Sequence, residues 1–417
     1  MLKVITSSRL FKSVAVYTVI NFLNKVFPFL LLPLFTRELS LNDYGIYSLV
    51  KALTNVLIPV IGFNVSEAVI RNFYNFERKQ FGNFITSALF IMTLICTFCL
   101  ILVFFIPQDI FERMFDLKSN YILIAMLISY FTAINNIERG LLRCENRNKV
   151  FAILVLSQTI TFFISVLILN YTNLLSLQNI VLMELISFSL FGFISLGLLK
   201  KKYNLGVLPN WVFIKSILSY SFPLVLNSLL AYLFALSDRF LISNRIDNSA
   251  VALYSATFQI VSILQILAVS FNGAWVPYVF KYLADENVNT LALNKKRYSL
   301  MIGFLLIGIL YYFLLSRYLV KILGNKYEGS DSLIIWMILS NILQAFYWIY
   351  SPIIQFFKKN WLLVYSSLPA VIFSLIMNFA YLSDKGIVFA AQVNTVSWLI
   401  IFSITFFSSN YLFNKRI

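Results

Sequence analysis

The stretch NFLNKVFPFLLLPLF, residues 21–35, is almost wholly apolar and is interrupted by a single lysine, Lys25. With the residues before it, this stretch forms an apolar segment over residues 13–35, long enough to cross a roughly 30 Å hydrocarbon core as a helix. Similar segments of about twenty residues recur along the chain. The chain has 417 residues, of which 60% are hydrophobic and 12% charged. Barrel strands would instead show ten-residue segments of alternating hydrophobicity. The sequence therefore predicts an all-α integral membrane protein.

The breaks between apolar segments predict about twelve transmembrane helices in two six-helix bundles. We expect one bundle in residues 1–199 and one in residues 217–417, joined by a basic cytoplasmic linker at residues 200–216. The predicted helices cover residues 13–35, 44–68, 83–106, 121–141, 150–170, 178–199, 217–242, 250–275, 298–316, 331–356, 361–382 and 387–410.

A weak internal repeat relates the two halves of the chain. At an offset of 207 residues, DYGIYS at residues 43–48 lies over AVALYS at residues 250–255. Because six helices return the chain to the side where it began, the two bundles have parallel topology, related by an axis along the membrane normal. Bundles related in this way rock around a central cleft in many transporters, so the repeat favours alternating access. The alternative is a chance match between apolar sequences.

The net charge of +16 indicates membrane topology rather than a nucleic-acid partner. If both termini lie on one side, that side holds 22 of the 33 Lys and Arg residues, the other side holds 9, and Lys25 and Lys51 lie within helices. Cytoplasmic loops carry such an excess, so we expect both termini in the cytoplasm. Cys96 and Cys99 have the C-x-x-C spacing of zinc and redox sites, but they lie mid-helix with no second pair and no histidine in the chain, which favours helix packing. The chain also has no G-x-x-x-x-G-K-[ST] loop for ATP, and we expect no cofactor.

Polar residues within the predicted helices recur at steps of three and four, which places them on one face of each helix. Such faces can line a hydrated cavity that binds sugars, or they can join neighbouring helices at roughly 0.6 kcal/mol per hydrogen bond. The pattern recurs on five helices, which favours a cavity. Its uncharged residues are predicted to include Asn21, Asn24, Asn55, Gln259, Gln344 and Trp348. On the second helix the face includes Asn55, Pro59 and Ser66, and on the seventh it includes Asn227, Ser228 and Tyr232.

Charged residues inside the membrane indicate a functional role more strongly than uncharged polar residues do, because they cost more free energy to place there. Lys25 lies roughly 18 Å from either end of its helix, too far to reach an interface. A central lysine costs about 2.5–3.5 kcal/mol, so we expect Lys25 to face water, a ligand or a counter-charge. Lys51 lies roughly 10 Å deep and could extend toward the interface. Asp238 and Arg239 fall near the outer end of their helix, where a binding role and an ordinary interface role are both open.

Three carboxylates in or near the predicted helices are expected to have different roles. Glu184 lies roughly 9 Å inside its predicted helix with no ionic partner nearby in the sequence, which makes it a candidate for ion coupling and a counter-charge for Lys25. Glu67 precedes Arg71 by four residues, the spacing of a helical ion pair. Asp43 follows Ser40 by three, the spacing of a capping box that begins a helix.

Three segments show a family resemblance. LLPLFTRELSLNDYGIYSLVKAL at residues 31–53, followed by EAVIRNFYNF at residues 67–76, resembles the start of Wzx-type O-antigen flippases, the polysaccharide transporters of the multidrug/oligosaccharidyl-lipid/polysaccharide (MOP) exporter superfamily. SDRFLISNRIDNSAVALYSATFQIV at residues 237–261 is similar to the family's matching D-R-x-x-I and Y-S motifs.

The resemblance implies a bacterial inner-membrane flippase with a MOP-type fold. Its substrate would be an undecaprenyl-pyrophosphate-linked oligosaccharide, moved from the cytoplasmic to the periplasmic leaflet. Polymerase and chain-length proteins of the same pathway are the partners to expect. Related lipid II flippases carry arginines where this chain has Lys25, so lipid II is a less expected cargo.

The expected mechanism uses a cleft between the bundles, lined by the first, second, seventh and eighth helices. The cleft would replace the water that the substrate's charges and hydroxyls lose in hydrocarbon. Lys25, Lys51 and Arg239 would attract the pyrophosphate.

One alternative is a multidrug/cation antiporter of the same superfamily, for which cavity carboxylates would suit better than a central lysine. Another is a membrane polymerase or glycosyltransferase, but the longest extracytoplasmic loop, residues 107–120, is short and has the acid spacing of an amphipathic helix. We therefore expect a transporter and not an enzyme.

Overall fold

A computed structural model of the chain describes residues 20, 23–24, 26–73, 75–145, 147–206, 208–284, 290–327, 329, 331–357, 359 and 361–415. These residues form helices and no strands. The chain divides into two compact units, Met1–Leu236 and Ser237–Ile417. The division falls within one long helix, α9 (Trp211–Arg245).

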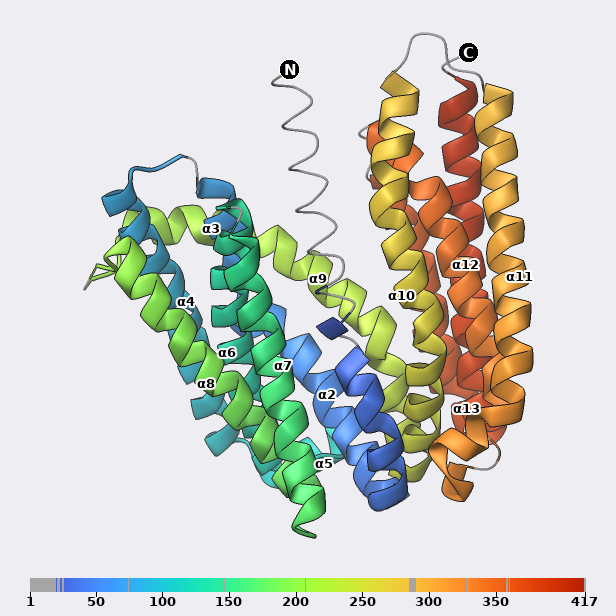
Figure 1. The fold of residues 1–417 in the computed structure, drawn as a ribbon, viewed down its shortest axis with the longest axis horizontal. Coiled ribbons are helices and arrows are strands. Elements are labelled where there is room, and N and C mark those ends of the chain that lie inside the picture. The colour runs from blue at the N-terminus through green and yellow to red at the C-terminus, as the bar shows by residue number, and fades with distance from the viewer. Residues whose placement is uncertain are drawn as a thin grey trace. The chain divides into compact units, whose positions relative to one another are not determined.

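Helix α6 is the centre of the first unit. It packs against α2, α3, α4, α7 and α8, and Figure 1 shows α4, α6, α7 and α8 running side by side. Residues 26–38, before α2, are helical as well. Besides the first part of α9, the helices of this unit are α2 (Leu41–Ile61), α3 (Val65–Asn72), α4 (Arg78–Phe105), α5 (Gln108–Phe115), α6 (Ser119–Cys144), α7 (Asn148–Tyr171) and α8 (Leu177–Tyr203).

The packing of α6 follows from the spacing of its apolar residues. Ala133, Ile134, Ile137 and Leu141 recur at steps of one, three and four, and they are buried in one core cluster with residues of α3 and α4. The outer helices expose apolar side chains instead. Phe104 on α4, for example, is 80% exposed. Apolar surface of this kind is what a lipid-facing helix presents.

In the second unit, α12 (Asp331–Phe356) takes the central position and packs against α10, α11 and α13 (Figure 1). The predicted bounds of this helix, 331–356, match those observed. The other elements of the unit are the end of α9, α10 (Asn248–Ala284), α11 (Thr290–Leu323), the short 3-10 helix η1 (Asn325–Tyr327) and α13 (Trp361–Asn414).

Helix α13 contains one residue with non-helical backbone, Gly386, at φ 71° and ψ −174°. This region of backbone space is essentially restricted to glycine. Gly386 divides α13 into two helical segments. The division falls between residues 382 and 387, where the sequence predicts the turn between the last two helices.

Nine helices in the described part of the chain are long and apolar enough to cross a membrane, judged by length and composition. The divided α13 is one of the nine, and α9 offers only a shorter apolar segment, Trp211–Leu226. Most of the first predicted helix, residues 13–35, lies outside the described residues. The prediction of an all-α, multi-pass membrane protein is confirmed. The count of twelve and the boundaries 1–199, 200–216 and 217–417 stay predictions.

The start of α2 has the predicted cap, but its end differs from the prediction. The Asp43 backbone N–H donates to the Ser40 hydroxyl oxygen at 3.0 Å, and the Ser40 hydroxyl donates to the Asp43 carboxylate at 2.7 Å. The single helix predicted over residues 44–68 is wrong: α2 ends at Ile61 and α3 begins at Val65. Pro59 and Gly62 weaken the helix there, and Phe63 and Asn64 then adopt positive φ angles of 44° and 46°.

Candidate functional site

A polar cavity of about 280 Å³ lies in the first unit beside the break between α2 and α3. The Asn64 side-chain amide donates to the Ser228 hydroxyl of α9 at 2.9 Å, and the Asn64 carbonyl accepts from the Ser221 hydroxyl at 3.4 Å. These bonds hold the break against α9. The cavity is lined by Ile58, Pro59, Asn64, Ser66, Glu67, Asn136, Arg143, Ser228 and Tyr232.

The lining joins polar faces that the sequence predicts on two separate helices. Pro59 and Ser66 belong to the polar face predicted on the second helix, and Ser228 and Tyr232 to the one predicted on the seventh. Amides and hydroxyls on these faces can exchange hydrogen bonds with a hydroxyl-rich ligand. The structure therefore brings the two faces together within one unit.

Two charged residues of the cavity were not among the predicted site residues. Arg143 comes from the last turn of α6, and Glu67 comes from the first turn of α3. The helical ion pair expected between Glu67 and Arg71 is not formed. The Arg71 guanidinium instead lies 4.4 Å from the centroid of the Tyr220 ring, and Glu67 lines the cavity.

Lys51 of α2 and Glu184 of α8 form an ion pair. Their side chains are 40% and 2% exposed, so the carboxylate is buried while the lysine still reaches the surface. The Tyr47 hydroxyl donates to the other Glu184 oxygen at 3.5 Å. Pairing offsets the cost of placing both charges in a membrane helix. Glu184 thus has a partner 133 residues away in the sequence, which no local pattern could indicate.

The ion pair and the polar cavity lie along one face of α2. Lys51, Asn55 and Pro59 follow one another at steps of four residues, which places them on the same side of the helix. From Lys51 to Pro59 the helix rises roughly 12 Å. Asn55, a predicted site residue, is half-buried between them. The face therefore leads from the ion pair to the cavity.

The predicted site residues of the first helix are only partly described. The Asn24 side chain accepts a hydrogen bond from the Thr159 hydroxyl of α7, which fits a role in joining helices. Asn21 and Lys25 lie outside the described residues, so their roles stay predictions.

Asp238 is the buried carboxylate of the second unit, at 2% exposure. It accepts hydrogen bonds from the Tyr254 hydroxyl at 2.9 Å and from the side-chain amides of Asn378 at 3.1 Å and Asn394 at 3.4 Å. The donors come from α10 and from both segments of α13. Sequence reasoning did not single out Asn378 and Asn394, because their common partner Asp238 lies 140 and 156 residues away in the sequence.

Arg239 is also buried, at 8% exposure. Its Nε donates to the Ser255 hydroxyl at 3.2 Å, and its guanidinium lies 5.0 Å from the centroid of the Phe258 ring. The burial of Asp238 and Arg239 argues against the interpretation of both as interface charges in contact with water.

The remaining predicted site residues are also in the second unit. Gln259 lies on α10, and Gln344 and Trp348 lie one turn apart on α12. All three are half-buried, and none is among the residues that line the polar cavity. Their predicted role in binding stays a prediction.

Comparison with known sequences identifies the family. Residues 10–283 match the model of a family described as polysaccharide biosynthesis protein. A protein of the Lsg locus of Haemophilus influenzae is 24% identical over 373 residues, which cover 87% of this chain and 89% of that protein. An uncharacterized membrane protein of the same organism is 24% identical over 385 residues, which cover 90% of each chain.

Comparison with solved structures identifies the fold. The lipid II flippase MurJ in an inward closed conformation has a TM-score of 0.75 at 16% identity, covering 94% of this chain and 87% of MurJ. A multidrug resistance transporter of the MATE family in an inward-facing conformation has a TM-score of 0.66 at 15% identity, covering 92% of this chain and 98% of the transporter. The MATE family belongs to the MOP superfamily. These likenesses show a MOP-type fold, as the sequence predicts. Because the family model matches well over half of the residues, the chain belongs to the polysaccharide biosynthesis protein family.

Proposed function

We propose that the protein is a flippase that moves a polyprenyl-pyrophosphate-linked oligosaccharide from the cytoplasmic to the periplasmic leaflet of a bacterial inner membrane. The family match supports a role in polysaccharide biosynthesis, and the MOP-type fold supports transport rather than catalysis. The proposal includes alternating access of the two halves, cytoplasmic termini, and polymerase and chain-length proteins as partners.

The observation that carries this proposal is the polar cavity beside the α2–α3 break. Sugar hydroxyls that leave water need donors and acceptors in return, and Asn64, Asn136, Ser228 and Tyr232 provide them. A volume of about 280 Å³ is close to the lower limit of roughly 300–1,000 Å³ for ligand sites. The cavity therefore suits one part of an oligosaccharide, with the polyprenyl chain left in lipid.

The Lys51–Glu184 ion pair supplies a route to ion coupling. While Glu184 is ionised, it holds the Lys51 ammonium. A coupling ion that binds Glu184 in place of Lys51 would release Lys51 to bind the substrate's pyrophosphate. Lys25 and Arg239 are the other cations proposed for that group. In this scheme Glu184 keeps its predicted role in ion coupling, and its state determines whether Lys51 is available to the substrate.

A cation antiporter is the second candidate function, and Asp238 favours it. A buried carboxylate surrounded by hydroxyl and amide groups has the ligand type that a small cation or a proton prefers. The polymerase or glycosyltransferase alternative has less support, because α5 occupies most of the loop that would have to hold its catalytic groups.

Two assays separate these functions. In cells that lack the protein, single lipid-linked repeat units should accumulate on the cytoplasmic side, whereas periplasmic accumulation of single units would indicate a polymerase. In proteoliposomes, the wild-type protein should flip a fluorescent polyprenyl-pyrophosphate oligosaccharide, and Lys51→Met should slow flipping. Efflux of a hydrophobic cation with no flipping of the lipid would favour the antiporter.

A further inference from the structure

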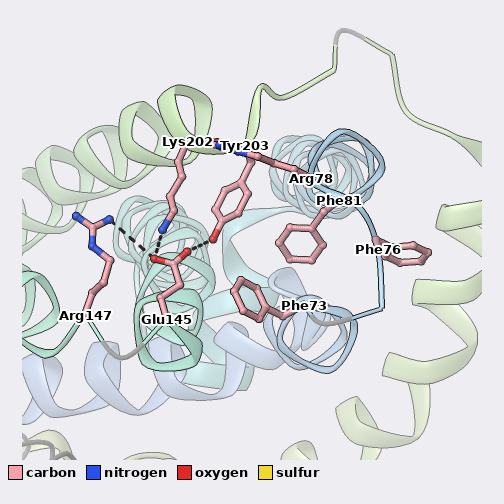
Figure 2. Close-up of a pocket in the computed structure, with 8 residues that line it drawn as sticks. All are labelled: Phe73, Phe76, Arg78, Phe81, Glu145, Arg147, Lys202 and Tyr203. Atoms are coloured by element: carbon pink, nitrogen blue, oxygen red, sulfur yellow. Dashed lines mark hydrogen bonds and ion pairs between the residues drawn. The ribbon is translucent and has the colours of Figure 1, made fainter.

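A second cavity, of about 430 Å³, lies where three connections of the first unit meet. Figure 2 shows the side chains of Arg147, Lys202 and Tyr203 directed toward Glu145, with the Phe73 and Phe81 rings beside them. The connections run from α3 to α4, from α6 to α7, and onward from the end of α8. The lining consists of Phe73, Phe76, Arg78, Phe81, Glu145, Arg147, Lys202 and Tyr203. We name it the loop cavity.

The Glu145 carboxylate joins the loops around this cavity. It forms an ion pair with Lys202 and accepts a hydrogen bond from the Tyr203 hydroxyl, both at the end of α8. Its contact with the Arg147 guanidinium is long, at 3.9 Å, and the Arg147 side chain is 48% exposed. Arg147 is therefore only weakly engaged.

Arg78 has no ionic partner among the described residues. Its Nε and one terminal nitrogen donate to the backbone carbonyl of Lys202 at 2.9 and 2.5 Å. These bonds fix the guanidinium plane beside the cavity without neutralising its charge. A guanidinium held in this way can still offer its remaining N–H groups to a phosphate oxygen.

The residues that line the loop cavity carry an excess of two positive charges. The lining contributes three cations, Arg78, Arg147 and Lys202, and one carboxylate, Glu145. The buried Glu138 on α6 does not line the cavity, but it interacts electrostatically with Lys202. This excess, reduced by the nearby Glu138, attracts an anionic group such as the phosphate of a lipid headgroup.

Aromatic rings form the other part of the lining. Phe81 makes edge contacts with Phe73, at 5.7 Å between ring centroids, and with Tyr203, at 5.3 Å. Cations next to apolar rings at the ends of membrane helices suit an amphiphilic ligand. The three connections also lie on the side of the membrane that the Lys and Arg distribution predicts to be cytoplasmic.

We infer that the loop cavity binds the headgroup phosphate of an anionic phospholipid in the cytoplasmic leaflet. Arg78 and Arg147 contact the phosphate, and the phenylalanine rings contact the glycerol and the first acyl carbons. Basic pockets between membrane helices on the cytoplasmic side bind anionic headgroups in this manner. The inference goes beyond the proposed flippase activity and does not depend on which cargo the protein carries.

The test uses the full chain in uncharged detergent with added phosphatidylglycerol, and measures lipid retention by native mass spectrometry. Arg147→Gln should weaken binding about tenfold, equivalent to roughly 1.4 kcal/mol, and Arg147→Lys should restore part of it. Lys149→Gln and Lys79→Gln are matched controls, because each removes one charge close to Arg147 or Arg78 without changing the lining. Glu145→Gln should strengthen binding, because it removes a competing anion.

Other ligands identify the occupant. Phosphatidylethanolamine, which has a phosphodiester but no net charge, and inorganic phosphate, which has no apolar part, should both bind more weakly than phosphatidylglycerol. Equal losses for Arg147→Gln and Lys149→Gln would overturn the inference. Tighter binding of undecaprenyl pyrophosphate than of phosphatidylglycerol would also overturn it and assign the loop cavity to the cargo. Since retention is measured and not flipping, failure here leaves the proposed function standing.

Discussion

Glu184 and Asp238 are both buried carboxylates, but the two units accommodate them differently. In the first unit, Glu184 is neutralised by a direct ion pair with Lys51. In the second, Asp238 receives hydrogen bonds from neutral groups on Tyr254, Asn378 and Asn394. An ion pair changes state only when one partner is replaced or protonated. A carboxylate held by neutral donors can take up a proton or a cation while keeping its surroundings, so the two sites should respond differently to substitution.

Lys51→Met should have the largest effect. It leaves Glu184 buried without its cation, and breaking a buried pair from one side costs about 3–5 kcal/mol of unfolding free energy. Glu184→Gln should cost less, because the remaining charge is on Lys51, whose side chain is 40% exposed and not enclosed in the core. Urea unfolding in micelles measures both. The double variant should recover most of the loss, and equal costs for the two single variants would show that the pair does not govern stability.

Asp238→Leu should cause the second-largest loss of unfolding free energy. It leaves the buried Tyr254 hydroxyl without its acceptor, at about 1–3 kcal/mol, whereas the Asn378 amide keeps a bond to the Ser374 hydroxyl at 3.4 Å. Asp238→Asn keeps an acceptor in place and should retain the fold, but it should abolish any dependence of transport on a cation gradient. Flipping measured with and without a sodium or proton gradient checks this prediction. If the Asn variant stays gradient-dependent, Asp238 is a structural residue.

Asn378→Ala should have a smaller effect on the same site. It removes one of the donors to Asp238 and should lower the unfolding free energy by about 0.5–1.5 kcal/mol. Thr395→Ala is a control on the same segment of α13 as Asn394, since the Thr395 hydroxyl donates to backbone carbonyls and not to Asp238. A cation dependence altered by Thr395→Ala would indicate a general effect of the helix.

Substitutions at Glu67 and Arg71 should have the smallest effect on stability. An exposed helical pair at this spacing contributes about 0.3–0.5 kcal/mol, but Arg71 lies on the Tyr220 ring. A double-mutant cycle with Glu67→Gln and Arg71→Gln should therefore give a coupling energy close to zero. A coupling as large as that of an ordinary helical pair would show that the two side chains do meet.

The sequence predicts most of the helices because their signal is local. An apolar segment of membrane-crossing length needs no tertiary information, and α12 has the predicted bounds. The break between α2 and α3 was missed although Pro59 and Gly62 lie beside it, because both residue types also occur within membrane helices and the apolar segment continues past them.

The site was less predictable because its contacts are long-range. The polar faces of the second and seventh helices were apparent from spacing, and the structure brings parts of them together at the polar cavity. The partner of Glu184, however, lies 133 residues away. Arg143, near the end of α6, looked like one of many cytoplasmic cations, and nothing in the sequence distinguishes it as a cavity residue.

Gly386 also determines how the length of α13 is divided. A continuous helix of 54 residues, the length of α13, would be roughly 81 Å long, far more than one bilayer crossing requires. The turn at Gly386 converts this length into a hairpin, so the last helix returns to the side from which α13 began. A methyl group added to the Gly386 Cα would meet no atom within 4 Å. What excludes other residues is therefore backbone geometry alone, and one achiral residue reverses the direction of α13.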